Sequence, residues 1–282
     1  MSKTSIVISK EQDGLTIKQL FGSLSYSNNH IRRLKYSGSI CVNGQKSTVR
    51  SILRVGDKVE LTVNENADIT PLNFDIKVIY DDEYLYAVYK PSGVPTHPKN
   101  FNTYPTLAHF IKARYDPNNN GFPIHIATRL DKDTSGIVLG AKDDVTKSLL
   151  STMLSLRQIE KTYCALCKGF FAEQSGTIIA PILRADIRLP FRIVSQDGKY
   201  AETHFQVLCQ YAEYALVQLR PITGRTHQLR VHMKHIGHPI LFDTLYGDAS
   251  DEQGQLALQC VGLSFVHPRF NTPLTISIPT TL

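Results

Sequence analysis

The sequence lacks a long apolar run. Residues 256–268 contain no charged side chain, but Gln259 and Ser264 interrupt the segment, and it is shorter than the about 20 apolar residues of a spanning helix. Residues 1–14 also lack the apolar stretch of a secretory signal. We therefore expect a protein without a membrane span or a signal peptide, located in the cytoplasm.

Cysteine is scarce, and its count is odd. Five cysteines are spread over a long chain, which does not fit the disulfide framework of a short secreted domain. Cys164 and Cys167 form a C-x-x-C without a second pair, so it is a weak metal motif. Four histidines near the C-terminus are irregularly spaced: His227, His232, His235 and His238. We expect reduced thiols and no metal ion.

Neither the composition nor the charge is extreme. With 42% hydrophobic and 20% charged residues, the chain is not a disordered, collagen-like or coiled-coil protein. The net charge of +6 is unevenly distributed, because residues 1–66 hold ten basic against five acidic residues and residues 67–282 hold twenty-one against twenty. This asymmetry predicts an N-terminal module that is attracted to phosphates. A solvated basic face is the alternative interpretation.

The N-terminal quarter has a characteristic order of elements. Residues 15–24 and the segment HIRRLKYSG have helix-like patterns, with Gly38 placed to end the second helix. A strand then runs into an Asn43-Gly44 hairpin turn, and a last strand follows a Gly56-Asp57 turn. Over about residues 13–64, this order resembles the S-four-type RNA-binding domain. The resemblance implies RNA contacts by Arg32, Arg33, Lys35, Lys46 and Arg50.

A second domain follows a polar linker at residues 67–73. Within residues 74–282, β-prone segments such as KTYCALCKGFF, AETHFQVLCQ and YALVQLRPI alternate irregularly with a helix-like run from Lys142 to Leu156. DPNNNGFP, from Asp116, is typical of a surface loop. The irregular order favours an α+β domain over a doubly wound one.

The segment ATRLDKDTSGIVLGA, residues 127–141, is the main candidate for chemistry. One interpretation is a calcium loop, with ligands at Asp131, Asp133, Ser135 and Gly136. Lys142 at the twelfth position, where a bidentate Glu is needed, argues against calcium. A second interpretation is a tight turn in which Asp131 and Thr134 bond backbone groups. The third is a catalytic aspartate that a cation keeps ionised.

RLDKDTSG, residues 129–136, resembles the signature of the RluA-type pseudouridine synthases. Three more segments match that family in the same order: KPSGVPTHP at 90–98, KTYCALCKG at 161–169, and GRTHQLRVHMKHIGHPILFDTLYG at 224–247. The resemblance implies an α+β catalytic domain with a mixed, mainly antiparallel sheet. It places Asp131 on the catalytic aspartate and Arg129 on the arginine that enters the RNA stack in place of the target base.

The same resemblance assigns roles to further residues. Tyr163 falls on the tyrosine that packs against the target uracil, Arg225 on the arginine that pairs with the aspartate, and Leu229 on the apolar wall of the pocket. Lys161 and Thr134 are also expected to contact the substrate. Two positions depart from the family pattern: Thr128 stands where a His is usual, and Phe242 where a Gly is common before Asp243.

These residue types fit the reaction. Uridine isomerisation breaks the bond from the sugar to a ring nitrogen, rotates the base and rejoins it through a ring carbon. Asp131 can attack the base, attack the sugar or remove a sugar proton, and Arg225 would lower its pKa and orient it. Tyr163 offers a flat face and a hydroxyl for proton transfer. No redox or group-transfer step occurs, so no organic cofactor is expected.

The target nucleotide must leave its stack, which costs a few kcal/mol and is easiest in a loop or bulge. Arg129 offsets part of this cost by stacking in the gap. The sequence thus predicts a monomeric RNA pseudouridine synthase acting on ribosomal RNA, with transfer RNA as the other candidate substrate. A catalytically inactive RNA-binding or ribosome-assembly factor and a metal-dependent hydrolase built on the histidines are the alternative hypotheses.

Overall fold

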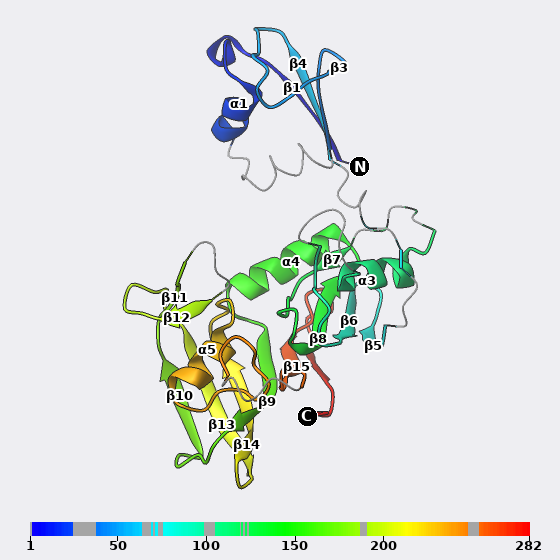
Figure 1. The fold of residues 1–282 in the computed structure, drawn as a ribbon. Coiled ribbons are helices and arrows are strands. Elements are labelled where there is room, and N and C mark those ends of the chain that lie inside the picture. The colour runs from blue at the N-terminus through cyan, green and yellow to red at the C-terminus, as the bar shows by residue number, and fades with distance from the viewer. Residues whose placement is uncertain are drawn as a thin grey trace. The chain divides into compact units, whose positions relative to one another are not determined.

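The computed structural model describes residues 2–24, 38–63, 69, 71–72, 76–98, 105–118, 120, 122, 124–186, 191–247 and 254–282. The chain divides into two compact units, residues 1–70 and 71–282, which are drawn in Figure 1. The segment predicted as a linker, residues 67–73, spans this division. None of the described helices is long and apolar enough to cross a membrane.

The N-terminal unit contains a four-stranded antiparallel sheet in the order β1-β4-β2-β3. Its strands are β1 (Ser2–Val7), β2 (Gly38–Val42), β3 (Gln45–Lys46) and β4 (Lys58–Val63), and a 3-10 helix, η1 (Lys10–Gln12), follows β1. The first predicted helix is confirmed as α1 (Ile17–Ser23), which begins after Thr16. The predicted hairpin is also confirmed, because Asn43 and Gly44 both have a positive φ between β2 and β3.

Strand β1 was not predicted, because its segment contains only two apolar residues, Ile6 and Val7. It pairs with β4 along its full length. Gly38, expected to end the second helix, is the first residue of β2. The rest of that predicted helix, with Arg32, Arg33 and Lys35, lies outside the described residues, whereas Lys46 and Arg50 are described and exposed.

The second unit is built on a ten-stranded sheet with the path β10-β13-β14-β9-β15-β8-β6-β5, to which β16 adds beside β15 and β7 beside β8. The strands before the centre of the chain are β5 (Val78–Asp81), β6 (Leu85–Lys90), β7 (His125–Ile126) and β8 (Ser135–Ala141). The others are β9 (Glu160–Lys168), β10 (Ser175–Ile179), β13 (Glu202–Gln210), β14 (Tyr214–Pro221), β15 (Leu258–Val266) and β16 (Pro273–Ser277). Among these described strands, only β8 and β15 pair in parallel, which confirms a mixed, mainly antiparallel sheet.

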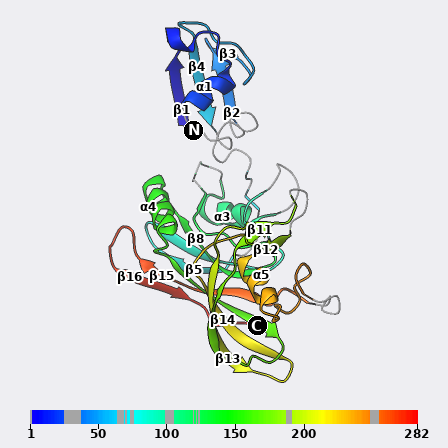
Figure 2. The same cartoon turned by 90° about the vertical axis from the view of Figure 1, so that its left-hand side faces the viewer.

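Three described helices and a separate hairpin accompany this sheet. The helices are α3 (Leu107–Tyr115), α4 (Asp144–Ser155) and α5 (Gln228–His235), and the hairpin consists of β11 (Ile182–Arg184) and β12 (Arg192–Val194). Helix α4 packs against β8, and α5 packs against β12 and β14. In both views, the β13–β14 turn lies at the end of the unit opposite α4 (Figures 1 and 2). The sequence predicted α4 but neither α3 nor α5.

Gly136 allows the parallel contact at the centre of the sheet. Its φ is +115°, and a Cβ atom there would lie 2.2 Å from the carbonyl oxygen of Cys260 on β15. Any other residue would push the two strands apart. The glycine of the RLDKDTSG segment is therefore required by the close approach of β8 and β15.

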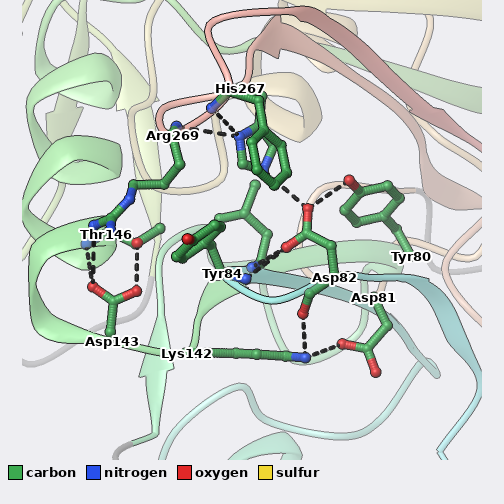
Figure 3. Close-up of polar contacts among 11 residues, drawn as sticks. Tyr80, Asp81, Asp82, Tyr84, Lys142, Asp143, Thr146, His267 and Arg269 are labelled. Atoms are coloured by element: carbon green, nitrogen blue, oxygen red, sulfur yellow. Dashed lines mark hydrogen bonds and ion pairs between the residues drawn. The ribbon is translucent and has the colours of Figure 1, made fainter.

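A polar cluster around Asp82 ties the β5–β6 turn to the chain that leaves β15 (Figure 3). The carboxylate accepts hydrogen bonds from the Tyr80 hydroxyl at 2.6 Å and from His267 Nε2 at 3.0 Å. Burial opposes ionisation of Asp82, but these and backbone hydrogen bonds lower its pKa below the usual value. The cluster lies where β8 ends, about 20 Å along the strand from the Asp131 loop, so we assign it a structural role.

Candidate active site

The RLDKDTSG segment forms the loop that leads into β8, and the two residues just before the segment are fixed to that strand. The backbone N–H groups of Ala127 and Thr128 donate to the carbonyl of Leu139 at 2.8 and 3.1 Å. The buried Thr128 hydroxyl accepts the N–H of Leu139 at 2.9 Å. This hydroxyl anchors the loop at the position where the family usually has a His.

The KPSGVPTHP segment holds the same loop from its other side. The fully buried Lys90 ammonium donates to three backbone carbonyls, those of Pro91, Val94 and Lys132, at 2.9, 2.8 and 2.8 Å. The Thr96 hydroxyl donates to the carbonyl of Leu130 at 2.9 Å. Burial lowers the pKa of Lys90 to about 8, although the charges of Asp133 and Asp131 oppose this shift.

These bonds determine which side chains of the loop are accessible. Arg129 is exposed, Leu130 is buried, and Asp131 is half-buried. The N–H of Thr134 donates to the Asp131 carbonyl at 3.2 Å, so the tight turn that the sequence suggested is present. The turn and a catalytic role are compatible, because this bond uses the backbone of Asp131 and not its carboxylate.

Strand β9 brings Tyr163 and Lys161 to the loop. Tyr163 is buried, and its pKa is raised well above the usual value by burial, then by the charges of Cys260 and Asp131. Lys161 lies on the same face of the strand, two residues earlier. Burial lowers the pKa of Lys161, and the nearby charge of Arg129 lowers it further. Two cations therefore stand close together beside the site.

Helix α5 supplies a buried arginine. Arg230 forms a bidentate ion pair with Asp243, with Nε and Nη2 at 2.7 and 2.6 Å from the carboxylate oxygens. Burial opposes its charge, but Asp243 and, more weakly, Asp131 raise the pKa of Arg230 above its usual value. The charge of Asp131 also acts on His227, whose pKa burial lowers. Leu229, predicted to line the pocket, is buried on the same helix.

Arg225 has different partners from those predicted. Its Nε donates to the carbonyl of Tyr200 at 2.9 Å, and its backbone N–H donates to the Gln228 side chain at 3.0 Å. Arg225 precedes α5, whereas Arg230 is buried within the helix. The described contacts therefore favour Arg230, rather than Arg225, as the cation that faces Asp131.

Comparison with known proteins finds relatives that match most of the chain. The protein-family model described as RNA pseudouridylate synthase matches residues 84–235 of this chain. A Bacillus subtilis protein named "Uncharacterized RNA pseudouridine synthase YjbO" is 36% identical over 272 residues, which cover 92% of this chain and 95% of that protein. The ribosomal large subunit pseudouridine synthase C of Buchnera aphidicola is 30% identical over 268 residues, covering 88% and 84% of the two chains.

The chain belongs to the RNA pseudouridylate synthase family. A solved structure of human RNA pseudouridylate synthase domain containing 1 has the same fold, with a TM-score of 0.63 at 24% identity over 73% of this chain and 84% of that chain. The activity of the protein is therefore the isomerisation of uridine to pseudouridine in RNA.

The histidines of this pseudouridine synthase each have a separate environment. His232 is buried between the Thr203 hydroxyl and the Ala180 carbonyl, at 3.0 and 2.9 Å. His227 Nδ1 lies 2.8 Å from the Tyr246 hydroxyl, and His238 stacks on Phe171. Within the described part of the chain, no three His, Cys, Asp or Glu side chains are grouped to hold a metal ion.

Phe242, the second departure from the family pattern, has a φ of 60°. A bulky side chain is disfavoured in this left-handed region, where glycine is not. The turn is nevertheless fixed, because the neighbouring Leu241 N–H donates to the Leu166 carbonyl and Asp243 is held by Arg230. The strained backbone at Phe242 thus belongs to the turn that places the Asp243 carboxylate against Arg230.

Sequence analysis missed Arg230 and Lys90 as parts of the site. Both lie in the matched segments, but neither has a distinctive spacing to a carboxylate. An amphipathic pattern in QLRVHMKH would have revealed α5, and with it the buried position of Arg230. The bonds of Lys90 to backbone carbonyls leave no signal in the sequence, because every residue has a carbonyl.

Proposed function

We propose that Asp131 is the catalytic residue of this pseudouridine synthase and that its substrate is ribosomal RNA. The observation that best supports the first part is electrostatic. Asp131 acts on Tyr163 of β9 and on Arg230 of α5, so segments far apart in the sequence converge on one carboxylate. Such convergence on a half-buried acid is typical of an active site.

Each group then has a defined task in our proposal. Arg230 keeps Asp131 ionised as a nucleophile or base. Tyr163 keeps its proton, because its pKa is raised well above the usual value, so it serves as a hydrogen-bond donor and a flat wall for the uracil. Attack on the base, attack on the sugar and removal of a sugar proton all require an ionised Asp131.

Arg129 and Lys161 are suited to hold the flipped nucleotide. Arg129 is exposed on the catalytic loop, where its planar guanidinium can stack in the gap that the base leaves. Lys161 lies close enough for the charge of Arg129 to lower its pKa. A phosphate between these two cations would relieve their mutual repulsion. Leu229 and Thr134 complete the proposed substrate contacts.

Ribosomal RNA is proposed because relatives from Buchnera aphidicola and Xanthomonas campestris are named ribosomal large subunit pseudouridine synthases. Transfer RNA is the alternative substrate. We propose further that residues 1–66 form an S-four-like RNA-binding domain, that the protein is a monomer and that it works in the cytoplasm. An inactive RNA-binding factor would not need Asp131, Tyr163 and Arg230 together.

The decisive experiment measures pseudouridine in unmodified large-subunit ribosomal and transfer RNA transcripts after incubation with wild-type protein and with Asp131→Asn. We expect the variant to lose at least about 100-fold in rate, because a catalytic acid or base alone contributes 100- to 10,000-fold. Asp133→Asn in the same loop is the matched control. Product from Asp131→Asn at the wild-type rate would refute the assignment, and modification of transfer RNA alone would refute the substrate.

The N-terminal proposal has its own test in the full chain. Lys46→Gln combined with Arg50→Gln removes two exposed charges of the first unit. We expect weaker RNA binding and a salt dependence whose slope falls by about one per lost phosphate contact. Deleting residues 1–66 should have a larger effect on binding than on the chemical step. Equal turnover by the truncated protein at physiological salt would contradict the proposal.

A further inference from the structure

Tyr200 is an exposed aromatic side chain two residues before β13. It is 46% exposed, whereas the next residue, Ala201, is fully buried. Because successive side chains of extended chain point to opposite faces, the burial of Ala201 directs Tyr200 outwards. Among the described residues, no ring and no cation is stacked on Tyr200. Tyr211, also strongly exposed, differs because its ring lies against that of Tyr214, with the ring centroids 4.8 Å apart and the planes tilted by 31°.

The position of Tyr200 is fixed although its ring is exposed. Its hydroxyl donates to the carboxylate of Glu202, which raises the pKa of Tyr200 and lowers that of Glu202. Arg225 Nε donates to the Tyr200 carbonyl. The buried Gln228 side chain bonds both the Arg225 N–H, at 3.0 Å, and the Glu202 carbonyl, at 2.9 Å. A ring held in this way loses little conformational freedom on binding a ligand.

The charges around Tyr200 are mostly positive. Arg157, in the turn after α4, interacts electrostatically with both Tyr200 and Glu202. Arg225 adds a second guanidinium. The carboxylate of Glu202 also accepts a hydrogen bond from His204 at 2.9 Å. An exposed aromatic ring flanked by two arginines is the combination that binds single-stranded nucleic acid.

The location of Tyr200 connects it with the catalytic loop. Arg225, which holds Tyr200, lies two residues before His227 in the turn that enters α5. The charge of Asp131 acts on His227. Arg225 and His227 thus link Tyr200 to the charge of Asp131, whereas Tyr211 lies about 35 Å further along the strand direction.

We propose that Tyr200 is a stacking platform for a nucleobase next to the target uridine, held in place by Arg225. Arg157 and Arg225 neutralise the adjoining phosphates. This inference deepens the proposed function and rests on RNA being the substrate of the site. It also gives Arg225 a role that does not involve Asp131.

The test is a binding measurement on the full chain with a mixed-sequence single-stranded RNA of about 12 nucleotides, since base stacking is sequence-tolerant. Tyr200→Ala should weaken binding about 10-fold, whereas Tyr200→Phe, which keeps the ring, should stay within about twofold of wild type. Tyr211→Ala is the matched control and should bind as wild type. Tyr200→Ala should also leave the salt slope unchanged, because no charge is lost, whereas Arg225→Gln should reduce it.

The outcomes separate this inference from the proposed function. Binding by Tyr200→Ala that equals wild type would overturn the stacking role. Equal weakening by Tyr200→Ala and Tyr200→Phe would also overturn it, because the hydroxyl would then be what matters. If the wild-type protein leaves ribosomal RNA unmodified but binds the oligonucleotide through the Tyr200 ring, the proposed substrate fails and the platform stands.

Discussion

The interior of the active site and its rim are built in different ways. Asp131 lies on a loop that Lys90 and Thr128 bond from both sides, and Arg230 is buried in a bidentate pair. Arg129 and Tyr200, which we propose to contact RNA at the rim, are exposed. The interior is fixed before RNA arrives, as catalysis requires. The rim keeps its charged and aromatic groups accessible, as recognition of an extended polymer requires.

The largest expected difference between interior and rim comes from removing one arginine at each place. Arg230→Met leaves the buried Asp243 carboxylate without its partner, so the free energy of unfolding should fall by about 3–5 kcal/mol. Arg225→Met removes a half-buried arginine and should lower it by about 1 kcal/mol or less. Urea denaturation of both variants and of the wild type measures these changes in the free energy of unfolding. An equal decrease in the free energy of unfolding in both variants would contradict the distinction between interior and rim.

A smaller effect should appear in the pH dependence that Lys90 contributes. Its pKa is about 8 in the folded protein, compared with its ordinary value of 10.5. Between these values the unfolded chain binds more protons, so the stability linked to Lys90 increases as the pH rises. The destabilisation of Lys90→Met relative to wild type should therefore be about 1–2 kcal/mol larger at pH 9.5 than at pH 7.5.

Urea denaturation of both proteins at the two pH values tests this prediction. Lys147→Met is the matched control, because Lys147 forms only an exposed pair with Asp144, and its effect should not change with pH. A difference between wild type and Lys90→Met that stays constant over this range would show that the folded protein does not depress the pKa of Lys90.

The sequence allowed the motifs and most central strands to be predicted. The segments KTYCALCKGFF, AETHFQVLCQ and YALVQLRPI contain β9, β13 and β14, and the predicted helix over 142–156 contains α4. Strand β1 could not be predicted, because its segment is mostly polar and its pairing with β4 joins residues far apart in the chain. Helices α3 and α5 were not predicted, because both are short and carry charged and histidine side chains among their apolar ones.

The candidate site, like the fold, could be predicted only in part from the sequence. Asp131 and Tyr163 were expected in one site, because the matched segments supplied both residues, and the charge of Asp131 acts on Tyr163. The choice between Arg225 and Arg230 could not be made from spacing alone. It depends on which arginine α5 buries, and thus on the packing of the helix against β12 and β14. Tertiary packing determines that choice.

The close approach at Gly136 also sets the width of the active site. Cys260 is in register with Gly136 on one side and with Tyr163 on the other, so three residues form a row across β8, β15 and β9. Neighbouring strands lie about 4.8 Å apart. Because β15 lies between β8 and β9, it holds the catalytic loop and the tyrosine strand two strand spacings apart. Backbone hydrogen bonds fix this spacing, and with it the room that we propose for the uracil between Asp131 and Tyr163, whereas a side chain at position 136 would widen it.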